Sequence, residues 1–386
     1  MAQQKTFSGQ KQRYIYIDLL RGWAVLVMIE VHVVNAFLLP ELRSPEWFKY
    51  LNFLNGLVAP SFLFVSGFSF VLVAQRKWDD YLNRTTVFRR QLGRILQILA
   101  VGYLLHLPFF SFGRLLYATE DEWGPFWKTD ILHTIALSLL TMVVFIVLAR
   151  EQKKNFILLV SFAVFVIFSS PLLYDRNLDS IFPEPVVNYF SAAHHSQFPL
   201  FPWMGFVLCG GVASQLLVWW RERVDEMKIF RRFFVGGIVM ILLSYTVNLL
   251  PVTVYPAHSY WRANPSFFFI RLGIVLMLLS SLWYWEKKFQ SGKSLVSIVG
   301  AESLIAYAGH LLVIYGQFFG GHSLSFLIGK TKDYSEVILM TAGLVLTTVV
   351  VSYVWHRIKN WSMFYARVLM YSILVVAAFI FFTNPY

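Results

Sequence analysis

Long apolar stretches make up most of this chain, and polar, charged or proline-bearing breaks separate them. A helix needs about 20 mostly apolar residues to cross the roughly 30 Å hydrocarbon core of a bilayer. A window of that length finds eleven such stretches, at residues 15–39, 50–74, 91–111, 131–149, 155–173, 199–220, 233–250, 267–285, 295–319, 337–356 and 364–382. Because an open sheet edge cannot be satisfied in lipid, each stretch predicts a spanning α-helix.

The composition supports a lipid environment. Of the 386 residues, 57% are hydrophobic and only 14% are charged, whereas soluble domains carry about a quarter charged residues. The single cysteine, Cys209, excludes an internal disulfide and a cysteine-based metal cage. We predict an all-α integral membrane protein, a polytopic bundle of about eleven transmembrane helices that forms one domain over residues 1–386.

The distribution of charge predicts the orientation. The net charge is +12, and membrane proteins gather Lys and Arg in their cytoplasmic segments. Every second connecting segment is net positive, beginning with Lys5, Lys11 and Arg13, while the segments between them carry little charge and together are net negative. The sequence therefore predicts a cytoplasmic N-terminus and an external C-terminus. Positive charge spread over short segments also excludes nucleic acid as a partner.

The first stretch carries more ionisable groups than a signal peptide or a plain anchor would. Such groups inside a spanning helix mark a cavity, a pairing or a site. At about 100° per residue, the eleven-residue step from Arg21 to His32 returns to the same helix face, about 16 Å further along the axis. Asn35 and Asp18 lie within about 60° of that line, and Glu30 lies opposite. We interpret this face as functional, although histidines in membrane helices are also used in packing.

Three segments near the N-terminus resemble the membrane-bound acyltransferase family 3. They are the run 14–37 with its Arg21 to His32 spacing, the segment 60–68 (PSFLFVSGF) and the basic segment 88–95 (FRRQLGRI). Three others are similar to the heparan-α-glucosaminide N-acetyltransferase catalytic family and its bacterial relatives, namely 130–133 (DILH), 198–205 (FPLFPWMG) and 300–310 (GAESLIAYAGH). The resemblance implies a membrane acyltransferase that uses acetyl-CoA, placed in a bacterial cell membrane.

The chain departs from the aminosugar enzymes at three points. It has no histidine in the segment 39–49, where they carry one, and it has His32 and Glu302 where we expect Asn. These departures leave the acceptor open. A sugar amine, a sugar hydroxyl and a lipid-linked glycan all remain candidate acceptors. The sequence also leaves open the acyl chain length and the oligomeric state, for which a homodimer is one option.

An enzyme that takes acetyl-CoA from the cytoplasm needs cationic side chains to bind the phosphates of the donor. Arginine can bind two phosphate oxygens through a pair of hydrogen bonds. The most basic cytoplasmic segment supplies Arg84, Arg89, Arg90 and Arg94. We expect these four to bind the donor, with Arg21 at a similar depth. Topology and anionic lipid alone would also favour such a cluster.

Counting from the helix ends places several polar groups at one depth in the outer half of the membrane. His32, His106 and His310 lie about 22 to 26 Å from the cytoplasmic boundary, and Arg271 on the eighth stretch reaches the same level. On the ninth stretch Ser303, Tyr307 and His310 share one face. With His133, these residues are our candidates for binding the acceptor.

The layout suggests a mechanism. His32 is the side chain best suited to act as a general base near neutral pH, and Asn35, Arg271 or His310 would stabilise the oxyanion. A covalent acetyl-imidazole on His32 is the other form of this hypothesis. No metal is expected, because the adjacent pair His194 and His195 offers no tetrahedral set.

Two other classes of function stay open. A proton-coupled secondary transporter, or a component of glycan-lipid export, would also use intramembrane charges such as Glu30 and Glu302. Such transporters are expected to show paired broken helices in two matching halves, and the sequence shows no internal repeat. A scaffold protein without chemistry is the third class.

Overall fold

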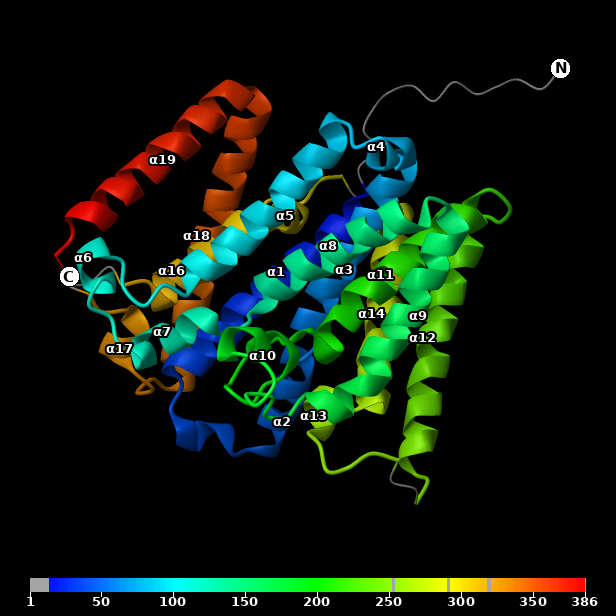
Figure 1. Cartoon of the computed structure of the whole chain (residues 1–386), viewed down its shortest axis with the longest axis horizontal. Coiled ribbons are helices and arrows are strands. Elements are labelled where there is room, and N and C mark those ends of the chain that lie inside the picture. The colour runs from blue at the N-terminus through cyan, green and yellow to red at the C-terminus, as the bar shows by residue number, and fades with distance from the viewer. Residues whose placement is uncertain (1–13, 252–253, 290–291, 318–320, 386) are drawn as a thin grey trace.

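The computed structural model describes residues 14–251, 254–289, 292–317 and 321–385. Within these ranges every regular element is a helix, and Leu38 forms an isolated β-bridge with Lys332. The charged N-terminal residues Lys5, Lys11 and Arg13 lie outside the described residues. Helices of very different length alternate along the chain, and the long ones form the body of the protein (Figure 1).

Each predicted stretch coincides with a long helix or a pair of helices. In chain order these are α1 (Ile15–Phe37), α2 (Glu46–Asn55) with α3 (Val58–Arg76), α5 (Thr86–Leu105), α8 (Ile131–Ala149), α9 (Gln152–Leu173), α11 (Leu200–Arg221), α12 (Glu226–Asn248), α14 (Pro265–Phe289), α15 (Leu295–Ala301) with α16 (Ser303–Tyr315), α18 (Tyr334–Trp361) and α19 (Met363–Thr383). Short helices complete the connections, namely η1 (Pro40–Arg43), α4 (Trp78–Leu82), α6 (Phe112–Leu115), α7 (Glu120–Trp127), α10 (Glu184–Phe190), α13 (Tyr260–Ala263) and α17 (Leu324–Ile328).

Seven described helical segments are long and apolar enough to cross a membrane, and the pair α15 and α16 makes eight if it counts as one span. The other three long helices, α1, α5 and α12, do not meet that test. α1, for example, contains Asp18, Arg21 and Glu30. The protein is thus a polytopic membrane protein, while the count of eleven spans and the orientation stay predictions.

The ninth stretch is not the continuous helix that the sequence predicts. It breaks at Glu302, and α16 turns by 88° from α15. Glu302 leaves the helical conformation with φ −106° and ψ 27°. Its buried carboxylate accepts hydrogen bonds from His356 Nδ1 at 2.9 Å and from Lys359 Nζ at 2.7 Å, both on α18. A buried carboxylate needs such partners, and the break places it where α18 provides them.

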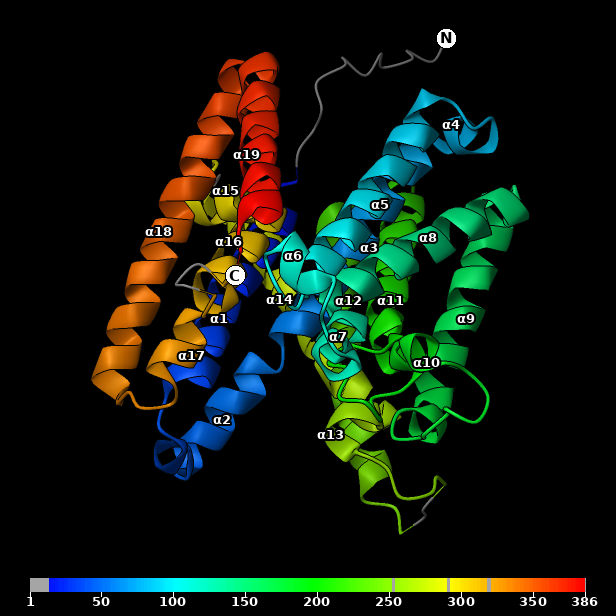
Figure 2. The same cartoon turned by 60° about the vertical axis from the view of Figure 1, so that its left-hand side comes forward.

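Close helix contacts build the core. Gly67 of α3 and Gly210 of α11 bring these two helices into backbone contact, because a Cβ on Gly210 would stand 2.0 Å from the carbonyl oxygen of Phe64. α1 runs through the middle, between the α15–α16 pair and α3 (Figure 2). The α18–α19 hairpin projects from the body of the protein (Figure 1), with α18 packed against α1, α15 and α16, and only 6% of the apolar window of α19 is buried. Its surface therefore faces outward, as expected for lipid contact.

Candidate active site: a buried aspartate among histidines

A buried carboxylate begins α8. Asp130 is the N-cap residue of this helix, and its Oδ1 accepts hydrogen bonds from the backbone N–H groups of Leu132 at 2.8 Å and His133 at 3.2 Å. The same oxygen accepts a hydrogen bond from His133 Nδ1 at 2.8 Å. Aspartate is a favoured N-cap residue, and here the cap also orients an imidazole, since the ring of His133 is one turn along the helix.

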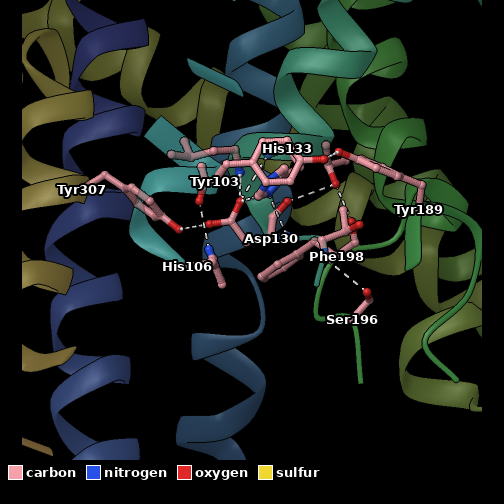
Figure 3. A network of polar contacts seen from close by, with 12 residues as sticks. Tyr103, His106, Asp130, His133, Tyr189, Ser196, Phe198 and Tyr307 are labelled. Atoms are coloured by element: carbon pink, nitrogen blue, oxygen red, sulfur yellow. Dashed lines mark hydrogen bonds and ion pairs between the residues drawn. The ribbon is translucent and has the colours of Figure 1, made fainter. Parts of the chain in front are cut away.

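A second helix completes the hydrogen bonding of this carboxylate. The hydroxyl of Tyr307, on α16, donates to Asp130 Oδ2 at 3.1 Å, and Asp130 is only 4% exposed (Figure 3). Burial by itself would raise the pKa of Asp130, but the hydrogen bonds from His133 lower it below its ordinary value. Asp130 is therefore a buried anion at the junction of α8 and α16.

Aromatic side chains enclose His133 on its other sides. The ring of Tyr103, on α5, meets it edge to face with centroids 4.3 Å apart, and the Tyr103 and Tyr189 hydroxyls lie 2.5 Å apart (Figure 3). His106 ends α5 with its ring 5.9 Å from that of His133. Its Nδ1 donates to the carbonyl oxygen of Gly102 at 3.0 Å, so Nε2 of the neutral ring is a hydrogen-bond acceptor.

Two more histidines adjoin Tyr307. The ring centroid of His310 lies 5.7 Å from that of Tyr307 and 5.3 Å from that of His32, which α1 contributes. Tyr315, at the end of α16, places its hydroxyl 3.5 Å from His32 Nδ1. We call His32, His106, Asp130, His133, Tyr307 and His310 the histidine cluster. Four helices supply it, and the charge of Asp130 acts on both His32 and His106.

The cluster contains two acceptor atoms without partners. His310 Nδ1 donates to the carbonyl oxygen of Ala306 at 2.8 Å, so Nε2 of its neutral ring carries a lone pair. His133 Nδ1 lies 2.8 Å from Asp130 Oδ1 and 3.3 Å from the Asp130 N–H. Because an ionised carboxylate can only accept, Nδ1 carries the proton and Nε2 again carries a lone pair. Both Nε2 atoms are buried and find no hydrogen-bond partner among the described residues. An unsatisfied buried polar atom costs about 1–3 kcal/mol, so the pair suits a ligand with N–H or O–H donors.

The connection before α11 closes the cluster on the side of α8. The hydroxyl of Thr134 donates to the carbonyl oxygen of Phe198, and the Ser196 hydroxyl accepts from the Thr129 N–H at 3.1 Å (Figure 3). Ser196 also donates to Asn188 at the end of α10. Hydrogen bonds thereby fasten the long segment 174–198 to the start of α8.

The structure brings together five of the predicted site residues and separates the others. His32, His106, His133, Tyr307 and His310 belong to the cluster. Arg21 instead donates to Ser69 at 2.8 Å, between α1 and α3. Asn35 is exposed, and Ser303 is the first residue of α16, next to the break at Glu302. Arg271 lies among aromatic rings of α11 and α14, away from the cluster.

The four arginines predicted to bind the donor lie at the other end of α5. Arg84, Arg89, Arg90 and Arg94 are all exposed, and no carboxylate among the described residues forms a salt bridge with them. α5 thus has a free cationic end and a histidine end. Arg94 and His106 are twelve residues apart, which corresponds to about 18 Å along a helix.

Sequence reasoning missed four members of this region. Asp130 enters the sequence-based prediction only within the DILH segment at 130–133, and no pattern in the sequence singles out Tyr103, Tyr189 or Tyr315. The spacing Asp-x-x-His at a helix start was the available signal, because an N-cap side chain and the residue three positions later face each other. Among the described residues, no group of three His, Cys, Asp or Glu is placed to hold a metal ion.

Comparisons with known proteins identify the family. No curated protein sequence matches the chain. The family model described as "Heparan-alpha-glucosaminide N-acetyltransferase, catalytic" matches residues 13–241, which is more than half of the chain and includes His32, His106, Asp130 and His133. Tyr307 and His310 follow the matched region. The chain belongs to the heparan-α-glucosaminide N-acetyltransferase catalytic family.

Proposed function

We propose that this membrane acetyltransferase transfers an acetyl group from acetyl-CoA to a hydroxyl or amine of a sugar or glycan acceptor. The family supplies the class of reaction. One observation carries the assignment of the site, namely the buried Asp130 carboxylate, joined to His133 directly and to His310 through Tyr307, with both histidine Nε2 atoms lacking a hydrogen-bond partner among the described residues. Amines and hydroxyls are the donors that such acceptor atoms bind, and they are also the nucleophiles that acyl transfer requires.

The proposal assigns the general base to His32. A base must reach the proton that it removes, and His32 is partly exposed beside the exposed Tyr315, whereas His133 and His310 are each 1% exposed. His32 would take a proton from the acceptor as the nucleophile attacks the thioester carbonyl. The C–S bond then breaks, and the CoA thiolate leaves. Attack by His32 itself, through an acetyl-imidazole, is the second form of the proposal.

The remaining cluster residues would support this step. His133 and His310 would accept hydrogen bonds from the acceptor through Nε2, and the negative charge of Asp130 would favour the imidazolium that forms on His32. Of the residues predicted to stabilise the oxyanion, His310 is the one that lies beside His32. Its neutral ring has no N–H left for that role, because Nδ1 donates to Ala306. Asn35 and Arg271 lie outside the cluster.

The donor would lie along α5. Its phosphates would bind the exposed arginines at the N-terminal end of α5, and its acyl arm would extend toward His106, about 18 Å away. With the predicted orientation, the donor would enter from the cytoplasm and the acceptor from outside. The acetyl group would then cross much of the bilayer, although the acetyl-CoA molecule as a whole would not.

The test is acetyl-CoA turnover by the purified protein in lipid nanodiscs. We expect release of free CoA thiol that depends on an added amino sugar or sugar hydroxyl, together with acetylated product detected by mass spectrometry. His32→Ala should lose this release. The matched control is His322→Ala, because His322 is exposed and stacks on Phe326 outside the cluster. Substrate uptake into vesicles without thiol release would contradict acyl transfer and favour the transporter alternative.

A further inference from the structure

A cavity that the proposed mechanism does not use lies at one end of the helix bundle. Its volume is about 250 Å³, and residues of α3, α9 and α11 line it. α11 packs against both α3 and α9 (Figure 1), and the cavity lies where α3 and α11 end and α9 begins. Pockets for drug-sized ligands measure about 300–1,000 Å³, so this cavity suits a smaller group.

The cavity lies at the level of the membrane surface. α9, α11 and the segment that contains α3 are each long and apolar enough to span a membrane, and the ends of spanning helices lie where hydrocarbon meets water. The charge distribution predicts this end to be cytoplasmic. Leu72, Val218 and Trp219 form the apolar part of the wall. A lipid headgroup can therefore enter the cavity while its acyl chains stay in the bilayer.

One cation at the cavity has no carboxylate partner. Arg76, at the end of α3, and Arg221, at the end of α11, both donate hydrogen bonds to the hydroxyl of Tyr14. Their guanidinium carbons lie 5.5 and 4.9 Å from the centroid of its ring. Arg221 also forms a salt bridge with Glu226, whereas Arg76 forms none with the described residues. Tyr14 thus holds the guanidinium of Arg76 in place, and the charge of Arg76 stays available for an anion.

Two hydrogen-bond acceptors line the same cavity. Glu222, directly after α11, is exposed, and its carboxylate has no partner in the part of the chain that the structure describes. Gln75 is only 9% exposed, and its Nε2 donates to Gln215 of α11. Its Oε1 is buried and accepts no hydrogen bond from the described residues. Because a buried acceptor without a donor costs free energy, this end of the cavity suits a group with N–H donors.

We infer that the cavity binds the headgroup of a phosphatidylethanolamine molecule from the surrounding membrane. The phosphate would accept charge-assisted hydrogen bonds from Arg76, and the ammonium group would donate to Glu222 and to Gln75 Oε1. Phosphatidylglycerol has the phosphate but no ammonium group, and the ammonium group of phosphatidylcholine has no N–H. The site would therefore prefer phosphatidylethanolamine to both. This inference does not depend on the proposed function.

A binding measurement tests the preference with the full chain. The protein, purified in detergent, is titrated with short-chain phosphatidylethanolamine, phosphatidylglycerol and phosphatidylcholine, and bound lipid is counted by native mass spectrometry. We expect phosphatidylethanolamine to bind at least about tenfold more tightly than the other two lipids, the equivalent of 1.4 kcal/mol. Glycerophosphoethanolamine, the headgroup without acyl chains, should bind more weakly than the lipid. Equal affinity for the three lipids, or for this headgroup and the lipid, would overturn the inference.

Two charge-neutralising variants separate the parts of the headgroup. Arg76→Gln should weaken the binding of phosphatidylethanolamine and phosphatidylglycerol alike, because both contain the phosphate. Glu222→Gln should weaken phosphatidylethanolamine alone, so the preference between these lipids should shrink. Both residues are exposed, so both variants should fold. The control is Arg223→Gln, which removes an exposed charge at the same end but outside the cavity lining, and it should bind as the wild type does. Wild-type affinity for phosphatidylethanolamine in either Arg76→Gln or Glu222→Gln would contradict the inference.

Discussion

The substitution Asp130→Asn tests the role of the buried carboxylate most sharply, because it changes charge with little change in shape. Asparagine is as good an N-cap residue as aspartate, so the start of α8 should persist. Its single amide oxygen can keep the bonds from Leu132 and His133 that Oδ1 now accepts. The amide nitrogen then faces the Tyr307 hydroxyl, which loses its anionic acceptor.

The expected magnitude follows from those contacts. A hydrogen bond to a charged group contributes about 1.5–3 kcal/mol, and the loss of the bond to Tyr307 should lower the free energy of unfolding by that amount. The same charge acts on His32. Loss of this stabilisation of the imidazolium should lower kcat, by about tenfold for each 1.4 kcal/mol lost in the transition state. Asp130→Ala should cost more stability, since it also removes the cap.

The assay combines CoA release with a pH series. In the wild type, hydrogen bonding keeps the Asp130 pKa below its ordinary value of 3.8. Its stabilising contribution is therefore fully present above that value and is lost as the pH falls through the lowered pKa. Asp130→Asn should remove this acid-induced loss of stability. If the variant keeps the wild-type kcat and an unchanged acid transition, Asp130 does not supply the negative charge of the histidine cluster.

Three further predictions concern other parts of the protein. His32→Ala should reduce CoA release to background while the melting temperature stays near that of His322→Ala, and robust turnover would remove His32 from catalysis. Arg90→Glu and Arg94→Glu should raise KM for acetyl-CoA several-fold with little effect on the acceptor, and an unchanged donor KM would count against the α5 site. Lys359→Met should lower the melting temperature by weakening the buried partners of Glu302, a loss that Lys330→Met, on the exposed surface, should not show.

The hydrophobic pattern was informative about the helices because the bilayer imposes one length and one backbone conformation on each apolar stretch. The departure at 295–319 has a local cause. Window averages treat Glu302 as one unfavourable residue in a long apolar run, and they contain no information about His356 and Lys359, more than fifty positions later. Those partners make the break favourable, so a tertiary contact overrides the local pattern.

The candidate site, too, could be predicted from the sequence only in part. Helical depth placed His32, His106 and His310 at one level, and contacts through Tyr307 and Asp130 link that level in the folded chain. Depth alone could not separate Arg271 from these histidines, because residues at the same depth on different helices can face different neighbours. Asp130 was overlooked because it lies just before a span, where a carboxylate is ordinary in sequence, and only the fold shows it to be buried.

The central claim is that the acyl group of the donor reaches the histidine cluster along α5. A structure of the protein in nanodiscs with a non-hydrolysable thioether analogue of acetyl-CoA tests it most directly. The account predicts density for the phosphates beside Arg84, Arg89, Arg90 and Arg94, and an acyl carbonyl carbon within about 4 Å of His32 or of an acceptor oxygen or nitrogen held by it. An acyl end that lies outside the cluster, with His32 turned toward lipid, would contradict the account.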